Sequence, residues 1–276
     1  MRYKSVGGFC LVCELRQTPY KVSIYFWIKM FTEKVTWVHH WSDRTFSFKC
    51  TRNTAFRFVA GEFAMIGLMI DGKRVVRAYS VVSPPWAEEL EFLSIKIQDG
   101  ELTGKLQHID IGSEVVIMPK CTGTLVNSAL EKGGELWMLA TGTGLAPFMS
   151  LIRDLETLET WTKIHIVHSV RDSSDLAYNT DLASAFKDHP QDGELHEMVG
   201  AVLKYHPILT GLGEHRITTQ LHMGHLPIDV EVDKIMVCGN LEFNHQVSDW
   251  CKSQGMKEGS IREPGTFVVE RAFVEK

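Results

Sequence analysis

The sequence predicts two domains: an antiparallel β-barrel, followed by an α/β domain built on a parallel, Rossmann-like sheet. The chain has 276 residues and 44% of them are hydrophobic, which is enough apolar material for two compact cores. Residues 31–126 form short alternating apolar runs broken by turn residues, a pattern typical of an antiparallel barrel. Beyond a polar connection at 127–134, apolar strands alternate with helical stretches, which predicts a parallel sheet covered by helices.

In the first region the clearest strand patterns lie at 45–50, 63–70, 75–82 and 90–97. Asp71-Gly72 separates the second from the third and predicts a tight hairpin turn, and Asp99-Gly100 and Ile111-Gly112 predict further turns. A short helix is expected at 102–108, starting at Thr103. The threonine is either a plain N-cap or, with the free amides of the first turn, a donor to a phosphate, and the two roles are compatible.

In the second region strands are expected at 136–140, at 163–170, in the run before Thr210, and at 234–238. Helices are expected at 148–155, 174–185 and 243–253. A parallel sheet of this kind binds its ligand at the carboxyl ends of the strands. The expected division of the chain is therefore an extension at 1–29, the barrel at 30–127, and the α/β domain with a C-terminal tail at 134–276.

The first 29 residues differ from the rest of the chain. They carry five basic residues and one acidic residue in a protein of net charge −5. Ser23 to Phe31 is apolar but too short for a bilayer span, and Cys10 and Cys13 have zinc-knuckle spacing without a second ligand pair. We expect an unstructured extension or an upstream start ahead of Met30; metal binding and organelle targeting are the alternatives.

Charge and cysteine usage exclude several classes of protein. The net charge of −5, with no basic block, argues against nucleic acid as the main partner. No apolar run reaches the roughly 20 residues of a membrane span. The six cysteines show no disulfide framework, so a reducing cytoplasm is the expected location. No metal is expected, because the pairs His39-His40 and His222/His225 lack further ligands.

Two short motifs contain the residues that suggest a binding site for a redox cofactor and a phosphate. The first is Arg77-Ala78-Tyr79-Ser80, which puts a cation, an aromatic ring and a hydroxyl at the end of an apolar segment. On a strand, Arg77 and Tyr79 point to one side and Ser80 points to the other. These three groups suit a flat redox ring that carries a diphosphate tail.

The second motif follows the strand at 136–140. Thr141-Gly-Thr-Gly144 forms a turn between this strand and the predicted helix at 148–155. A strand, a glycine turn and a helix N-terminus place free backbone N–H groups against a phosphate.

Several further motifs occur in one order along the chain: Phe92-Leu-Ser-Ile-Lys-Ile97, Leu102-Thr-Gly-Lys-Leu-Gln107, His168-Ser-Val-Arg171, Leu176-Ala-Tyr178, Cys238-Gly239 and Glu270-Arg-Ala-Phe-Val-Glu-Lys276. Together with the two motifs above, they make the chain from about Met30 to Lys276 resemble the bacterial ferredoxin (flavodoxin)–NADP reductases. The tail resembles the subclass that ends in Ala-Phe-Val-Glu-Lys. The extension at 1–29 lies outside the resemblance.

The resemblance implies an FAD on the barrel. Tyr79 would stack on the flavin ring, Ser80 would lie near flavin N5, and Arg77 would neutralise the diphosphate. The remaining expected FAD contacts are Ala78, Ile95, Lys96, Leu102, Thr103, and the tail residues Ala272 and Phe273. Tyr79 has the alternative of an ordinary barrel aromatic, and Lys96 that of a solvated strand residue.

The resemblance also implies an NADP(H) site on the α/β domain, with Cys238 beside the nicotinamide. The remaining expected nucleotide contacts are Thr143, Gly144, Val170, Arg171, Thr210 and Arg216. Cys238 is expected to shape the hydride geometry rather than to attack a substrate, since no nucleophile constellation surrounds it; a buried structural cysteine is the alternative. For Arg216 the alternative is surface ion pairing.

The tail and two departures from the family pattern refine this expectation. Ala272 would lie on the flavin face opposite Tyr79, and Phe273 would stack on the adenine of FAD. Where relatives have Thr-Arg-Glu, this chain has Thr210-Gly211-Leu212, and the residues after Gly239 also differ. We therefore expect NADPH to be preferred over NADH by a smaller margin than is usual in the family.

The resemblance implies an FAD-dependent ferredoxin–NADP⁺ reductase that exchanges hydride with NADP(H) and single electrons with ferredoxin or flavodoxin. We expect a monomer located in the cytoplasm. The nearest alternative is an NAD(P)H reductase that serves an oxygenase or free flavin. An alternative from another class is a non-catalytic flavin-binding electron-transfer subunit, which the intact Thr141–Pro147 turn disfavours. With no cysteine cluster in the chain, the partner must carry any iron–sulfur cluster.

Overall fold

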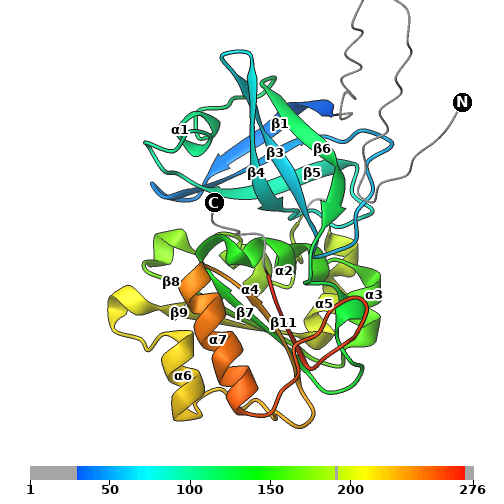
Figure 1. Cartoon of the computed structure of the whole chain (residues 1–276), viewed down its shortest axis with the longest axis vertical. Coiled ribbons are helices and arrows are strands. Elements are labelled where there is room, and N and C mark those ends of the chain that lie inside the picture. Colours follow the sequence, from blue (N-terminus) through cyan, green and yellow to red (C-terminus); the bar gives the residue numbers. More distant parts are fainter. Residues whose placement is uncertain (1–29, 190–191, 271–276) are drawn as a thin grey trace, which may run out of the picture.

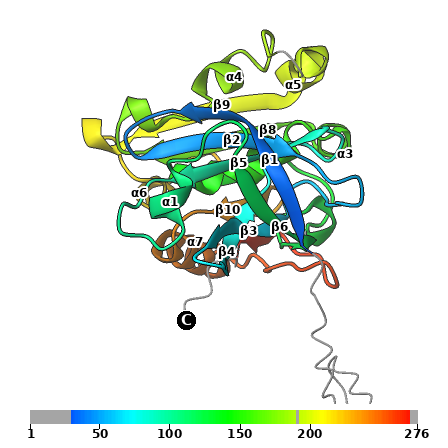
Figure 2. The same cartoon turned by 90° about the horizontal axis from the view of Figure 1, so that it is seen from above.

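The structure is a computed structural model that describes residues 30–189 and 192–270, and it has two stacked domains (Figure 1). The barrel lies over the α/β domain, as the view from above also shows (Figure 2). The extension at 1–29 and the tail residues Ala272 and Phe273 fall outside the described residues. Within the described residues, no helix has the length and apolar character needed to cross a membrane.

The first domain is a six-stranded antiparallel sheet in the order β4-β3-β6-β1-β2-β5. Its elements are β1 (Phe31–His40), β2 (Thr45–Thr51), β3 (Phe63–Ile70), β4 (Lys73–Ser80), β5 (Glu89–Ile95), α1 (Thr103–Leu106) and β6 (Glu114–Thr122). A bridge between Val81 and Phe92 joins the two edge strands and closes the sheet into a barrel. Asp71 and Gly72, with φ of 49° and 71°, form the predicted hairpin turn.

The barrel core follows from the alternation of side chains along the strands. On β2, Phe46 and Phe48 are fully buried in the core cluster that also holds Phe92 of β5. Ser47, between the two phenylalanines, is equally buried but lies outside this cluster. A strand residue that is buried on the outer face of a barrel must be covered by another part of the molecule, and here the second domain covers it.

The second domain is a five-stranded parallel sheet in the order β11-β10-β7-β8-β9. Its strands are β7 (Leu136–Thr141), β8 (Ile164–Val170), β9 (Leu203–Leu209), β10 (Lys234–Cys238) and β11 (Phe267–Val269). Its α-helices are α2 (Ala146–Leu151), α3 (Leu155–Thr160), α4 (Asn179–Ala183), α5 (His196–Val202), α6 (Ile217–Met223) and α7 (Leu241–Ser253). The short 3₁₀ turns are η1 (Asn127–Ala129), η2 (Gly142–Leu145), η3 (Ser173–Asp175), η4 (Gly193–Leu195) and η5 (Thr210–Leu212).

Helices cover both faces of this sheet. Alternate residues of β7, such as Met138 and Ala140, pack with α2 to α5, while Trp137 and Leu139 pack with α6 and α7. The first of these two clusters also takes in Ala60, Val82 and Leu93 of the barrel. The two domains therefore share one continuous apolar core through η2 and α2. The predicted fold class, a barrel followed by a parallel α/β sheet, is confirmed.

Three local expectations were wrong. The helix expected at 148–155 is two helices, because the chain breaks after Leu151 and α3 restarts at Leu155. The helix expected at 174–185 is reduced to η3 and the five-residue α4. Thr103 is not an N-cap: Leu102 occupies that position, and the Thr103 hydroxyl donates to the carbonyl of Ile97 over 3.2 Å. In the two helices the apolar pattern continued past the residues at which the helical backbone ends.

Candidate functional site

The two motifs meet at the junction of the domains. Strand β7 has β8 on one side and β10 on the other, so the order of the parallel strands reverses between β7 and β10. Such a reversal opens a crevice at the carboxyl ends of the two strands, which is where α/β proteins bind ligands. Turn η2 lies at this point and also contacts β5 of the barrel. The crevice is thus bounded by both domains.

The end of β4 supplies the barrel side of the crevice. Tyr79 and Ser80 are the last two residues of β4, directly before the bridge that closes the barrel. Tyr79 packs against the barrel core, and its hydroxyl is 3.1 Å from Oγ of Ser94. Burial raises the pKa of the Tyr79 phenol, so the group stays protonated. Ala78 and Ser80 are half-buried, which leaves their side chains partly open to a ligand.

Arg77 lies apart from the barrel core, with 57% of its side chain exposed. It donates to Glu101 over 2.8 Å and to the carbonyl of Val76 over 2.8 Å. Its charge is close enough to Tyr79 to lower the pKa of that phenol slightly against the effect of burial. Arg77 and Tyr79 are therefore neighbours, as their spacing on a strand predicts. An exposed ion pair such as Arg77–Glu101 is weak and can yield to a diphosphate.

The other barrel residues lie at the end of β5 and in the loop after it. Ile95 ends β5 with 41% of its surface exposed, although it is apolar. Lys96 is not a solvated strand residue, because its Nζ donates to the carbonyl of Ser42 over 2.6 Å. Leu102 is buried, and the α1 turn that it begins presents backbone N–H groups that have no partner within a helix.

Turn η2 supplies the α/β side. Gly142 has φ of 53°, a conformation that L side chains rarely adopt, and a Cβ there would meet no atom within 4 Å. The opposite holds at Gly144, where a Cβ would lie 2.1 Å from the carbonyl oxygen of Cys238. Glycine at 144 thus brings the β7 turn into backbone contact with the end of β10. Thr143 lies between the two glycines, half-buried at the crevice.

Cys238 is 2% exposed at the end of β10. Burial, helped by the negative charge of Glu270, raises the pKa of its thiol well above the usual range. A protonated thiol is a poor nucleophile, so the structure supports a shaping role rather than attack on a substrate. Glu270 itself is held beside this strand, since its N–H donates to the carbonyl of Val237 over 2.9 Å and its carbonyl accepts from Asn244 over 3.0 Å.

A second group of predicted residues gathers at the ends of β8 and β9. The hydroxyl of Thr210 donates to the carbonyl of Val170 over 3.1 Å, and the N–H of Gly211 donates to the carbonyl of Arg171 over 2.8 Å. Arg171 is exposed beside this contact. A Cβ at Gly211 would lie 2.5 Å from the Arg171 carbonyl oxygen, so an arginine at 211 requires this loop to move.

Arg216 is exposed at the N-cap of α6, on the same edge of the sheet. Neither Arg171 nor Arg216 forms an ion pair with any residue in the described ranges. The alternative of surface ion pairing for Arg216 is therefore not seen among these residues. Two guanidinium groups without ion pairs in the described ranges, one after the C-terminal end of β8 and one at the N-cap of α6, suit a phosphate.

His168 supports the η2 turn and was missed as an individual residue. It is fully buried on β8, its Nε2 is 3.0 Å from the carbonyl of Gly142, and its Nδ1 is 3.4 Å from the hydroxyl of Tyr205. Burial lowers its pKa to about 4, so the ring is neutral at neutral pH and Nε2–H donates to Gly142. In the sequence it was visible only as the first residue of the motif His168-Ser-Val-Arg171, with no role assigned to it.

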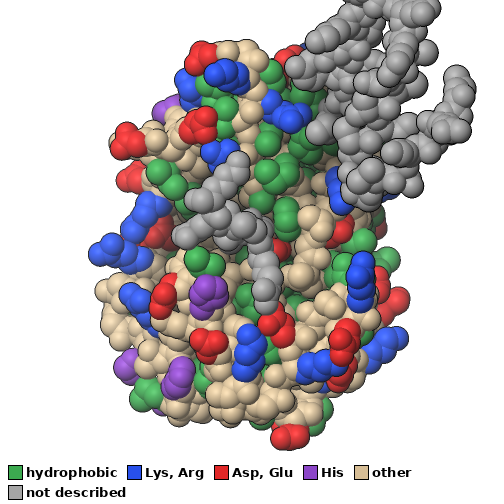
Figure 3. Space-filling model, in the orientation of Figure 1, with side chains coloured by type: hydrophobic (Ala, Val, Ile, Leu, Met, Phe, Trp, Pro, Cys, Tyr) green, Lys and Arg blue, Asp and Glu red, His purple; other side chains and the backbone are tan. Residues whose placement is uncertain are grey.

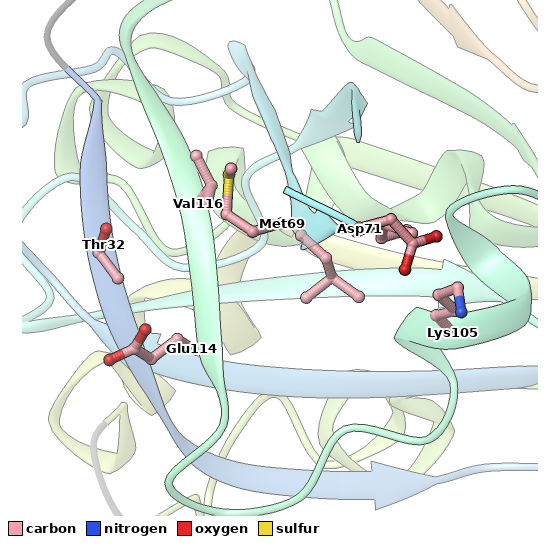
Figure 4. A pocket seen from close by; sticks show the side chains of 8 residues that line it. Thr32, Met69, Asp71, Lys105, Glu114 and Val116 are labelled. Atoms are coloured by element: carbon pink, nitrogen blue, oxygen red, sulfur yellow. The ribbon is translucent and has the colours of Figure 1, made fainter. Parts of the chain in front are cut away.

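A separate pocket of about 370 Å³ lies on the barrel, away from the crevice (Figure 4). Its wall is built by residues of β1, β3, α1 and β6, with the neighbouring hairpin turn: Thr32, Leu68, Met69, Ile70, Asp71, Lys105, Glu114 and Val116. Asp71 and Lys105 lie on one side of it, and Thr32 and Glu114 on the other. None of the predicted site residues lines it, so the pocket is not the site that the motifs indicate.

The remaining observations concern charge and metals. On the face shown in Figure 3, acidic and basic side chains of the described residues are interspersed rather than gathered in one block. Among residues 30–189 and 192–270, no group of three or more metal-ligating side chains is placed to hold a metal ion. The cysteines of the described ranges, Cys50, Cys121, Cys238 and Cys251, are all free.

The crevice fits a flavin and a dinucleotide on its own geometry. The barrel side offers an aromatic ring, a half-buried hydroxyl and an exposed guanidinium. The α/β side offers a glycine turn at the strand-order reversal and two unpaired guanidinium groups. These donors match a diphosphate and a flat ring system, and the contact between η2 and β5 brings the two halves together.

Comparison with known proteins agrees with this division. Residues 33–123 match the family described as oxidoreductase FAD-binding domain, and residues 138–249 match that described as oxidoreductase NAD-binding domain. A flavodoxin/ferredoxin–NADP reductase of Rhodobacter capsulatus is 47% identical over 253 residues, which cover 88% of this chain and 93% of the relative. A ferredoxin–NADP reductase of Pseudomonas aeruginosa is 42% identical over 258 residues, covering 90% of this chain and 99% of the relative.

Among solved structures, a ferredoxin NADP⁺ reductase from Neisseria gonorrhoeae with bound FAD and NADP is similar to this chain. The two superpose with a TM-score of 0.78 at 28% identity, over 89% of this chain and 99% of the other.

Proposed function

The chain belongs to the flavodoxin/ferredoxin–NADP reductase family, and from that premise we propose that it catalyses hydride exchange with NADP(H) and single-electron exchange with ferredoxin or flavodoxin. It is an oxidoreductase whose cofactors are FAD and NADP(H). FAD, when bound, accepts a hydride at N5 and releases electrons singly, which converts a two-electron donor into a one-electron donor.

The observation that carries the proposal is the meeting of the end of β5 with the η2 turn at the strand-order reversal. It lets one domain hold a flavin and the other a nicotinamide nucleotide, with both rings in a single crevice. We assign Cys238 to shaping the position of the nicotinamide, since burial raises the pKa of its thiol and a protonated thiol is a poor nucleophile.

On the barrel, we assign Tyr79 to the flavin ring and Arg77 to the diphosphate. Ser80 is assigned to a hydrogen bond at N5, where a hydroxyl stabilises developing charge. Ile95 and Lys96 contribute backbone groups, since the Lys96 side chain is already bonded to Ser42. The free N–H groups of the turn at Leu102 and Thr103 add to the diphosphate site, although the Thr103 hydroxyl is committed to Ile97.

On the α/β domain, we assign Thr143 and Gly144 to the nicotinamide nucleotide and Arg171 and Arg216 to its 2′-phosphate. Both guanidinium groups are free of ion pairs within the described residues, which supports NADPH over NADH. With Gly211 in place of an arginine, we propose that the preference is narrower than in Arg-bearing relatives. Ratios of kcat/KM for the two nucleotides test this, and strong exclusion of NADH contradicts it.

The tail is proposed to cover the crevice. Glu270, the last described residue, is bonded to Val237 of β10, next to Cys238, which supports this proposal. We assign Ala272 to the flavin face and Phe273 to the adenine of FAD, as in the subclass that the tail resembles. An aromatic stack adds only about 0.5–1.5 kcal/mol, so Phe273→Ala should weaken FAD binding by roughly tenfold or less. Fluorescence titration of the apoprotein measures it, and an unchanged affinity contradicts the assignment.

We propose the division 1–29, 30–127 and 134–276, with activity confined to the last two segments. A variant that starts at Met30 should retain FAD and NADPH oxidation; insoluble or flavin-free protein contradicts this. A cytoplasmic location is also proposed, because the described cysteines are free thiols. We propose a monomer as well. Size-exclusion chromatography with light scattering tests the oligomeric state, and cell fractionation tests the location.

One experiment tests the function itself. The purified protein should be yellow, NADPH should bleach the flavin absorbance, and the reduced protein should reduce ferredoxin or flavodoxin. Bleaching without transfer to either carrier favours a reductase of an oxygenase or of free flavin. Flavin that NADPH does not bleach leaves only a non-catalytic flavin-binding subunit, and the proposal is then wrong.

A further inference from the structure

The loop that follows β8 is fastened to the barrel. Asp175 accepts from the hydroxyl of Ser42 over 2.8 Å, and Arg44 forms ion pairs with both Asp172 and Asp175. Arg44 and Ser42 belong to the turn between β1 and β2, whereas Asp172 and Asp175 directly follow Arg171 in the α/β domain. The loop 171–178 therefore connects the proposed phosphate-binding arginine with the barrel.

Tyr178 ends this loop in an uncommon conformation. Its φ is 58° and its ψ is 16°, in the left-handed region that residues other than glycine rarely adopt. Its side chain is 4% exposed, and the ring lies 4.7 Å from that of Trp41 of the barrel. Such a conformation persists only when surrounding contacts hold it, and clusters at functional sites.

The Tyr178 hydroxyl joins two barrel strands at once. It is 2.7 Å from Oγ of Ser47 on β2 and donates to Oε1 of Glu91 on β5 over 2.7 Å. Both barrel residues are buried, at 0% and 3% exposure. Because the tyrosine O–H is used for Glu91, the Ser47 O–H donates to Tyr178, and Ser47 in turn accepts from the indole N–H of Trp41 over 2.8 Å. The three hydrogen bonds form a series from Trp41 to Ser47 to Tyr178 to the Glu91 carboxylate, with every donor directed toward Glu91. In such a series each hydrogen bond strengthens the next.

The α/β domain also places a positive charge near the Glu91 carboxylate. Arg153, 2% exposed, is 4.0 Å from Glu91 and donates to Asp192 over 2.9 Å and to the carbonyl of Val82 of the barrel. Burial alone would raise the pKa of Asp192, but the hydrogen bond from His189 and the charge of Arg153 hold it below its usual range. Glu91 is thus contacted from the second domain by a hydroxyl and by a guanidinium.

These contacts are linked to the crevice through the backbone of β5. Lys96, in the proposed flavin site, bonds the carbonyls of both Ser42 and Arg44. The turn that holds Asp172 and Asp175 is therefore the same turn that fixes the end of β5 beside η2. A change in the position of the loop 171–178 would alter the distance between the flavin side and the nucleotide side of the crevice.

We propose that Tyr178 is a positioning residue for hydride transfer: its hydroxyl, held between Ser47 and Glu91, fixes the α/β domain against the barrel and so sets how the nicotinamide meets the flavin. The inference rests on the proposed function. Hydride transfer requires reacting atoms within about 3–3.5 Å, and a misplacement of about 1 Å can cost roughly a hundredfold in rate.

Tyr178→Phe in the FAD-loaded protein is the primary test. It removes one hydroxyl and keeps the ring against Trp41. We expect the rate constant for flavin reduction by NADPH, measured by stopped flow at saturating NADPH, to fall at least tenfold. The FAD content should stay within twofold of the parent, and so should the affinity for adenosine 2′-phosphate, a probe of the 2′-phosphate site proposed on the α/β domain. The long-wavelength absorbance of stacked nicotinamide and flavin, formed on adding NADP⁺, should weaken as well.

Thr157→Val is the matched control. Its hydroxyl is also fully buried and accepts from the Asn127 side chain over 2.8 Å, but it bonds neither Ser47 nor Glu91. We expect this variant to reduce flavin at the parental rate. Ser47→Ala removes the other side of the Tyr178 bond, so it should slow reduction too, and the double variant should be no slower than Tyr178→Phe alone.

The inference is overturned if Tyr178→Phe or Ser47→Ala folds with FAD and reduces flavin at the parental rate. It is also overturned if the two losses simply multiply, or if Thr157→Val is slowed as much as they are, since Tyr178 would then be one stabilising contact among others. If Tyr178→Phe does not fold, Ser47→Ala decides alone. Failure of NADPH to bleach the parent protein would instead overturn the proposed function, which keeps the two failures distinct.

Discussion

The interface between the domains has two unlike ends. At one end lies the buried network of Ser47, Glu91, Arg153, Tyr178 and Asp192, where charged and polar groups are at most 4% exposed and bonded across the domains. At the other end lies the crevice, where Ser80 and Thr143 are half-buried and Arg77 is largely exposed.

The difference follows from the cost of burying polar groups. A buried charge must be paired and hydrogen-bonded, so each charged member of the network is bonded within the protein itself, although Oδ1 of Asp192 has no hydrogen-bond partner among the described residues. Groups that are to receive a ligand must instead keep access to water until the ligand arrives. The network therefore fixes the domains, while the crevice leaves its donors available for a flavin and a nucleotide.

The largest expected effect is the loss of unfolding free energy on removing a charge from the buried network. Arg153→Met removes the cation and leaves Glu91 and Asp192 buried without it. Breaking a buried ion pair in this way costs about 3–5 kcal/mol of unfolding free energy. Denaturant unfolding of the FAD-saturated protein measures it. Arg57→Met, which removes an exposed arginine bonded only to carbonyls, is the control and should cost less than about 1 kcal/mol. Equal losses in the two variants would contradict the contrast between the two ends.

In the crevice, Ser80→Ala should leave stability unchanged and slow the chemistry. One transition-state hydrogen bond accounts for about 2.7–4 kcal/mol at most, or roughly 10²–10³ in the rate of flavin reduction. Stopped-flow reduction by NADPH is the measurement, and FAD content is read from the absorbance. Ser253→Ala, at the exposed end of α7, is the control. A parental rate in Ser80→Ala would make Ser80 a structural strand residue.

His168 gives the crevice a dependence on pH. Burial lowers its pKa to about 4, so between pH 6.5 and 4 the unfolded chain binds a proton that the folded chain does not. The free energy of unfolding should therefore decrease as the pH is lowered from 6.5 to 4. At 1.36 kcal/mol per pH unit, the loss is roughly 3 kcal/mol at most. His168→Gln should remove that part of the slope. An identical slope in both proteins would show that other groups cause it.

The smallest effect is expected at the outer edge of the crevice. Leu212 is apolar, 78% exposed, and follows Gly211, where a side chain would press against the carbonyl of Arg171. Leu212→Arg adds a cation without that contact. An exposed ion pair contributes about 0.2–1 kcal/mol, so kcat/KM for NADPH should rise by roughly fivefold at most. NADH kinetics and the uncharged variant Leu212→Gln are the controls; an equal gain with NADH would exclude an effect on the 2′-phosphate.

The sequence by itself determined the features that depend on a few neighbouring residues. Alternating apolar residues predicted the barrel strands, and Asp71-Gly72 predicted the hairpin turn. The glycine turn after β7 predicted a ligand site at the carboxyl ends of the parallel strands. Each is a local preference: a period of two, a positive φ, or a strand followed by a helix. The prediction of one helix at 148–155 was wrong, because the apolar pattern continued while the helix ended at Leu151 and a second one began at Leu155.

Only the tertiary structure decided how the domains meet. Tyr178 lies 131 residues from Ser47 and 87 residues from Glu91, and no pattern in one sequence relates positions so far apart. Ser47 lies between two phenylalanines of the strand pattern, and its buried hydroxyl has Tyr178 as its acceptor only because the second domain covers that face of β2. Burial and hydrogen bonding across a domain boundary depend on the whole fold, so the partners and the role of these residues are decided only by the tertiary structure.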